Sequence, residues 1–116
     1  MKITNMNSHL LVRGIRDDLN KLGSTKGKKS FQRFFKDKVK CYGIKSADTG
    51  NISKKYWQLV SDQSKDIIFD ICEILFSSDY SEEAFIASSF SYNKKSEYKP
   101  EDFKIFENWI EKYINN

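Results

Sequence analysis

The segment from residue 65 to residue 76 reads Lys-Asp-Ile-Ile-Phe-Asp-Ile-Cys-Glu-Ile-Leu-Phe. Its apolar residues recur at helical spacing and form one stripe, widened by its neighbours around the helix. They are Ile67, Ile68, Phe69, Ile71, Cys72, Ile74 and Leu75. A helix that is apolar over so much of its circumference is buried between other helices. The segment therefore predicts the centre of a helical core.

Amphipathic segments with the same periodicity lie on both sides of this central helix. With it they predict six helices, at about residues 7–22, 28–37, 46–61, 64–76, 81–92 and 100–114. Residues 39–46 have strand-like character but no second strand to pair with, so we expect an extended connection that buries Tyr42 and Ile44. The fold class is therefore all-α, with paired antiparallel helices as in an α-solenoid or a small bundle. No internal repeat of fixed period decides between these two.

The last predicted helix carries a strongly apolar face. Pro100 suits its first turn. Its stripe consists of Phe103, Phe106, Ile110, Tyr113 and Ile114, with Trp109 alongside. Burying a large apolar side chain contributes roughly 1.5–3 kcal/mol, so this face needs a neighbour. We expect a protein partner or further repeats to pack on Phe103, Phe106, Trp109 and Ile110. Residues 1–116 then form one helical domain that is the N-terminal part of a larger one.

The charge is divided unevenly along the chain. Residues 1–60 hold 14 Lys and Arg against 4 Asp and Glu, whereas residues 61–116 hold 6 against 12. The densest basic cluster lies between Lys26 and Lys40. Such asymmetry favours contact between one surface and a polyanion, and a solvated lysine-rich face is the alternative.

Several classes of function lack their sequence signals. No apolar run approaches the ~18 residues that span a bilayer, and the charged N-terminal segment is no secretory signal, so we predict a cytoplasmic protein. Cys41, Cys72 and the single histidine, His9, have no metal-ligand spacing, and no glycine-rich phosphate loop is present, so we predict no metal and no cofactor. The adjacent acids at positions 17–18 and 82–83 are interpreted as solvated helix faces rather than catalytic dyads.

Aromatic and basic residues are interleaved in one stretch. Phe34, Phe35 and Tyr42 lie among five cations, namely Arg33, Lys36, Lys38, Lys40 and Lys45. Cations that hold phosphates beside rings that hold bases are the parts of nucleic-acid sites. The same rings are also explained as core residues by their helical spacing.

The sequence resembles a known family over most of its length. The resemblance rests on Phe31-Gln32-Arg33-Phe34-Phe35-Lys36, Tyr42-Gly43-Ile44-Lys45-Ser46, Ile52 to Leu59, Cys72-Glu73-Ile74-Leu75, Glu83-Ala84-Phe85-Ile86-Ala87 and Phe106-Glu107-Asn108-Trp109-Ile110. These segments are similar to the DNA alkylation repair proteins of the AlkD type. Membership implies HEAT-like repeats curved around duplex DNA. It also implies a DNA glycosylase that excises N-alkylated purines such as 3-methyladenine and 7-methylguanine.

Carried over residue by residue, the resemblance implies few site residues in this chain. Phe34 and Lys45 fall on lesion-proximal positions, and Lys28, Lys29, Arg33 and Lys36 are candidates to face the DNA. The catalytic Asp tract of the family is expected after Asn116, so this chain alone is expected to be inactive. Two rival hypotheses are a non-catalytic helical-repeat module that binds a protein, and a basic DNA-binding domain without an enzymatic parent.

Overall fold

The computed structural model describes residues 7–35 and 38–114, and every regular element within these ranges is helical. The α-helices are α1 (Ser8–Leu22), α2 (Thr25–Gln32), α3 (Ser46–Val60), α4 (Lys65–Ser77), α5 (Ser81–Asn93) and α6 (Phe103–Trp109). Short 3-10 turns at Lys95–Glu97 and Pro100–Asp102 precede α6, and a π-helical turn at Ile110–Ile114 continues it. The prediction of an all-α fold is confirmed. None of the described helices has the length and apolar content to cross a bilayer.

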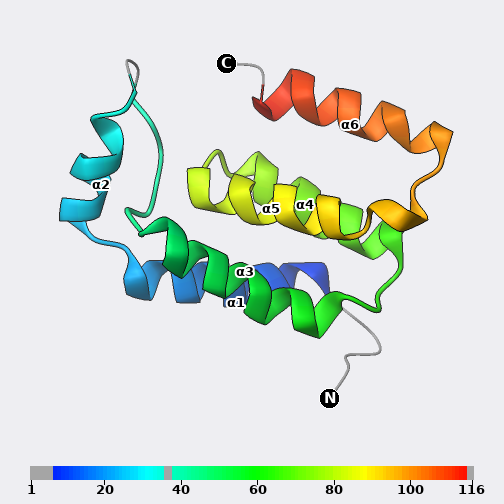
Figure 1. Cartoon of the computed structure of the whole chain (residues 1–116), viewed down its shortest axis with the longest axis horizontal. Helices are drawn as coiled ribbons and strands as arrows, with labels where there is room; N and C mark the ends of the chain where they lie inside the picture. The colour runs from blue at the N-terminus through cyan, green and yellow to red at the C-terminus, as the bar shows by residue number, and fades with distance from the viewer. Residues whose placement is uncertain (1–6, 36–37, 115–116) are drawn as a thin grey trace.

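The helices are arranged as antiparallel pairs. Figure 1 shows α1 beside α3 and α4 beside α5, with the two members of each pair running in opposite directions. Helix α1 contacts α4, and helix α3 contacts α5. The first helix of one pair therefore packs on the first helix of the other pair, and the second helix packs on the second. Helix α6 packs on α4 and opens a third layer, which is the stacking expected of a HEAT-like segment. Helix α2 lies outside the pairs, between α1 and α3 in the chain.

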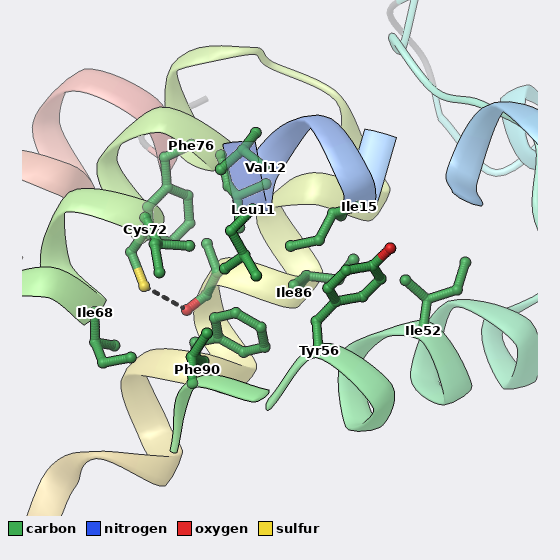
Figure 2. Packing of buried hydrophobic residues seen from close by; sticks show 14 of the residues in the cluster. Leu11, Val12, Ile15, Ile52, Tyr56, Ile68, Cys72, Phe76, Ile86 and Phe90 are labelled. Atoms are coloured by element: carbon green, nitrogen blue, oxygen red, sulfur yellow. Dashed lines mark hydrogen bonds between the residues drawn. The ribbon is translucent and has the colours of Figure 1, made fainter. Parts of the chain in front are cut away.

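The core lies where the two pairs meet. Figure 2 shows side chains from α1, α3, α4 and α5 converging on one interior. The residues with no exposed surface include Ile15, Leu19, Val60, Ile68, Ile71, Cys72, Leu75, Ile86 and Phe90. The prediction that α4 is the buried central helix is therefore confirmed. Burial raises the pKa of the Cys72 thiol to about 12, and its Sγ donates to the carbonyl oxygen of Ala87 at 3.3 Å.

Helix α6 turns a different face inward from the one predicted. Trp109 is 3% exposed and packs among aromatic rings of α4, and its indole N–H donates to Glu73 Oε1 at 3.1 Å. Phe106 is half-buried beside it. Phe103 and Ile110 remain 68% and 54% exposed. The prediction that Trp109 shares one docking face with Phe103 and Ile110 was therefore wrong. The large indole ring packs inward together with its hydrogen-bond acceptor, and this contact sets the rotation of the helix.

Helix α2 begins and ends earlier than the predicted range of 28–37. The Ser24 hydroxyl accepts from the N–H of Gly27 at 2.9 Å and caps the helix one turn upstream of the predicted start. The helix ends at Gln32, so Phe34 and Phe35 follow it instead of lying on its face. Phe34 is 84% exposed, which contradicts the interpretation of this ring as core.

Candidate nucleic-acid interface

Residues 38–45, which lead into α3, form no helix or strand and make the predicted connection, in which Tyr42 and Ile44 pack toward the core. Tyr42 is 7% exposed, and Ile44 is half-buried against the core cluster. The Tyr42 ring stacks on Tyr80 with centroids 4.2 Å apart, and its hydroxyl donates to Glu83 Oε2 at 2.6 Å. Burial, followed by this bond to a carboxylate, raises the pKa of Tyr42 above its ordinary value. Residues 41–44 of the connection are thus packed into the domain.

A buried glutamate holds the backbone of this connection. Glu82 Oε1 accepts from the N–H of Tyr42 at 3.0 Å, and Oε2 accepts from the N–H groups of Gly43 and Ile44 at 3.0 and 3.2 Å. These N–H groups do not donate to a neighbouring strand, and the carboxylate accepts their hydrogen bonds instead. Glu82 lies in the first turn of α5, where a negative charge is also favoured by the helix dipole.

The neighbouring Glu83 joins three segments. It accepts from Arg16 Nε of α1 at 3.0 Å as well as from the Tyr42 hydroxyl. Glu82 and Glu83 are 5% and 0% exposed, so the interpretation of this pair as a solvated face was wrong. A carboxylate is buried only when donors surround it, and those donors come from α1 and from the connection.

Two glycines bring α2 against the connection, backbone to backbone. A Cβ at Gly27 would lie 2.0 Å from the carbonyl oxygen of Gly43. Gly43 itself has a φ of +83°, in the left-handed region that favours glycine. The N–H of Ser24 donates to the carbonyl oxygen of Tyr42 at 3.1 Å across the same contact. No residue of α2 is fully buried, so this backbone contact is what positions the helix.

A groove of about 410 Å³ opens between α2 and the start of α3; we call it the outer groove. It brings together the two predicted lesion-proximal residues, Phe34 and Lys45. Lys45 is exposed and directly precedes α3, and Lys26 of α2 adds a second cation. The full lining is Leu22, Ser24, Lys26, Gly27, Ser30, Phe31, Phe34, Gly43, Ile44, Lys45, Ser46 and Asp48.

The other predicted basic residues lie nearby but outside this lining. Lys28 and Lys29 are exposed on α2, and Arg33 follows its last residue. Arg33 Nη2 donates to Ser30 Oγ at 3.1 Å. Lys36 lies outside the described residues. The direct role of these four cations stays a prediction.

A second cavity, of about 230 Å³, adjoins the outer groove; we call it the inner pocket. The two share Phe31, Ile44 and Ser46. The inner pocket adds Phe85 and Glu82 of α5, together with Thr49 and Ser81. The sequence analysis gave Phe85 no role in a site and therefore missed this pocket. Only the structure shows that Ile86, Ala87 and Phe90 form the apolar part of the buried face of α5, whereas Phe85 is 52% exposed.

A family model described as DNA alkylation repair enzyme matches residues 15–116. The match begins within α1 and includes the outer groove and the inner pocket. The chain belongs to the DNA alkylation repair enzyme family. The resemblance noted from the sequence is thereby confirmed, and the role of the protein lies in DNA repair. Searches of curated proteins and of solved structures found no match.

In this DNA alkylation repair protein, the groove side combines exposed cations, exposed rings and the N-terminal end of α3. These groups are chemically suited to phosphates and bases. Of the acids that line the two cavities, Glu82 is already engaged by three amides and Asp48 lies in the first turn of α3. Within residues 7–35 and 38–114, no three His, Cys, Asp or Glu side chains gather as metal ligands.

Proposed function

We propose that this chain is a segment of a DNA glycosylase that excises N-alkylated purines, such as 3-methyladenine and 7-methylguanine, from duplex DNA. Its own part is to bind the DNA along the outer groove. The observation that carries the proposal is the family match together with the placement of Phe34 and Lys45 on one groove. Glu82 is committed to holding the connection, so the proposal assigns this chain DNA binding and assigns it no catalytic carboxylate.

The physical basis of binding is the phosphate charge of the duplex. Lys26 and Lys45 both line the groove, Lys26 from α2 and Lys45 from the residue that precedes α3. A lysine that neutralises a phosphate releases a condensed counterion, so affinity falls as salt rises. The peptide N–H groups at the start of α3 add partial positive charge at the same end. Phe34, with most of its ring exposed, offers a surface for stacking or for contact in a groove of the DNA.

We further infer a cytoplasmic location. Cys41 and Cys72 are both free and buried, which fits a reducing compartment.

The test is salt-dependent binding of the chain to a fluorescent duplex, measured by anisotropy. Each lysine that contacts a phosphate contributes about 0.9 to the slope of log K against log[salt], so Lys26→Ala with Lys45→Ala lowers the slope by roughly 2. Lys104→Ala on α6 removes an equal charge away from the groove and leaves the slope nearly unchanged. Absence of binding at low salt, or equal losses from the groove and control variants, contradicts the proposal.

A second candidate function is a non-catalytic helical module that binds a protein or a further repeat. One observation favours it, namely the exposure of Phe103 and Ile110 on the outer face of α6. Trp109 is not part of that face, because it is buried against α4. Failure of the duplex-binding test, with the chain folded, places this candidate first.

A further inference from the structure

We propose that Glu82 is a positioning residue for DNA binding, which holds Lys26 and Lys45 where both line the outer groove. This inference rests on the proposed function and adds to it a residue that acts through other residues. The Glu82 side chain is 5% exposed, and it accepts from three backbone N–H groups of the connection. Its effect on DNA therefore passes through the segments that it holds.

The backbone of Lys45 is fixed on both sides. Ile44, the residue before it, donates its N–H to Glu82 Oε2 at 3.2 Å. The carbonyl oxygen of Lys45 accepts from the N–H groups of Asp48 and Thr49 in the first turn of α3, each at 3.0 Å. Lys45 thus lies between the carboxylate contact and the start of a helix, and its exposed side chain extends from a fixed point.

The same carboxylate positions α2. Tyr42 and Gly43 each donate an N–H to it at 3.0 Å, and α2 rests on these two residues. The N–H of Ser24, the N-cap of α2, donates to the Tyr42 carbonyl oxygen at 3.1 Å. A Cβ at Gly27 would lie 2.0 Å from the Gly43 carbonyl oxygen, so the two backbones are in contact. Because α2 has no fully buried residue, a shift of the connection moves Lys26 with it.

The position of Glu82 is in turn set by the packed core. Glu82 lies in the first turn of α5, which packs on α3 and α4 through Ile86 and Phe90, both with no exposed surface. The N–H of Ser81 donates to the carbonyl oxygen of Lys40 at 3.0 Å and joins the start of α5 to the connection. The carboxylate therefore transmits the position of the core to the lysines that face the DNA.

Charge and position predict opposite effects of removing this carboxylate. If Glu82 acts by charge alone, the loss of an anion near the lysines strengthens their attraction for phosphates. If it acts by position, its loss leaves the binding arrangement populated for only part of the time. The apparent Kd then rises by the inverse of that populated fraction. The direction of the change in Kd separates the two effects.

The experiment measures the affinity of the 116-residue chain and its variants for a fluorescein-labelled duplex by anisotropy. Glu82→Gln removes the charge and puts a donor NH2 group in place of one acceptor oxygen, so we expect Kd to rise severalfold. Glu82→Ala removes both acceptor oxygens, and we expect a rise of about tenfold, as for an arrangement populated about a tenth of the time. The slope of log K against log[salt] stays unchanged, because the bound complex makes the same phosphate contacts.

Ile86→Val is the matched control on the same helix. Ile86 is fully buried and lines neither cavity, so this variant loses stability through the core and leaves the groove intact. We expect its Kd for the duplex to equal that of the unmutated chain. A loss of affinity that merely follows stability would appear in both Ile86→Val and Glu82→Gln.

Hydrogen exchange identifies the cause of the weaker binding. In Glu82→Gln the amides of Tyr42, Gly43 and Ile44 lose protection, whereas the amides of α4 keep it and show that the chain is folded. Added duplex restores protection at the three amides, because DNA selects the arrangement in which the connection is closed.

The outcomes separate this inference from the proposed function. Equal or tighter duplex binding by Glu82→Gln overturns the inference alone, since the unmutated chain still binds with the expected salt slope. Equal losses of affinity in Glu82→Gln and Ile86→Val also overturn it. An unmutated chain that binds no duplex removes the proposed function, and the inference falls with it.

Discussion

The central pair α4–α5 and the helix α2 are held in the domain by different forces. Helix α4 buries Ile68, Phe69, Ile71, Cys72, Leu75 and Phe76, whereas α2 has no fully buried residue. The pair is stabilised by apolar area removed from water. Helix α2 is positioned by the backbone contact at Gly27 and Gly43 and by a connection that a buried carboxylate holds. The position of α2, which lines the candidate site, thus depends mainly on backbone and polar contacts.

This difference predicts where the molecule opens first. Regions with few buried apolar contacts open locally at lower free energy than a packed core. We therefore expect substitutions in the core to unfold the whole domain and substitutions at the connection to release mainly α2.

The largest effect is expected in the packed pair. Phe90 is fully buried between α3 and α4, and Phe90→Ala leaves a cavity that costs about 3–5 kcal/mol of unfolding free energy. Urea denaturation followed by circular dichroism measures this loss. Phe34→Ala removes the same ring from an exposed position and changes stability by no more than about 0.5 kcal/mol. Similar losses for the two variants contradict the comparison.

Removal of the carboxylate that holds the connection is expected to have the next largest effect. Glu82→Ala leaves the N–H groups of Tyr42, Gly43 and Ile44 without their acceptor. Each hydrogen bond to a charged group contributes about 1.5–3 kcal/mol, but the released amides can bond to water once the connection opens, so we expect a total loss of about 3 kcal/mol. Hydrogen exchange shows lost protection of these three amides, and Glu101→Ala, at an exposed position, is the control. Unchanged protection contradicts the role assigned to Glu82.

A smaller effect is expected from closing the space between α2 and the connection. Gly27→Ala places a methyl group against the Gly43 carbonyl and costs about 1–3 kcal/mol through forced displacement. Gly50→Ala is the matched control, because nothing lies within 4 Å of a Cβ at that position of α3. Since Gly lowers helix stability by roughly 0.5–1 kcal/mol relative to Ala, this control gains stability. The two variants therefore shift the urea midpoint in opposite directions.

The smallest effect concerns the polar contact between α1 and α3. Hydrogen bonds from Lys55 and then from Tyr56 lower the pKa of Asp18 below its ordinary value of 3.8. Because the folded-state pKa is the lower one, the stabilisation is full above the unfolded-state value. It is lost as the pH falls through the folded-state pKa.

Urea denaturation of Asp18→Asn at neutral and at acidic pH tests this sign. The variant is less stable than the parent chain at neutral pH, and the difference shrinks under acidic conditions. Asp17→Asn, at an exposed neighbouring position, shows no such pH dependence. A difference that grows on acidification contradicts the assignment.

The candidate site was only partly predictable from sequence. Lys45 and Phe34 were proposed from family resemblance, and the fold places both on the outer groove. Phe85 was not proposed as a site residue, and an aromatic residue on an apolar helix is usually buried. Its exposure is evident only when the buried face of α5 is complete without it.

The amino-acid sequence by itself determined the helices and the central position of α4, since apolar periodicity acts within a few turns of one helix. It also determined the extended connection, because a lone strand has no partner. Only the tertiary structure decided that Glu82 is buried, because its donors lie about 40 residues away in the chain. The same holds for the inner pocket, whose walls come from α2, α3 and α5. Contacts between distant segments follow from packing and closure of the chain, and local periodicity carries no information about them.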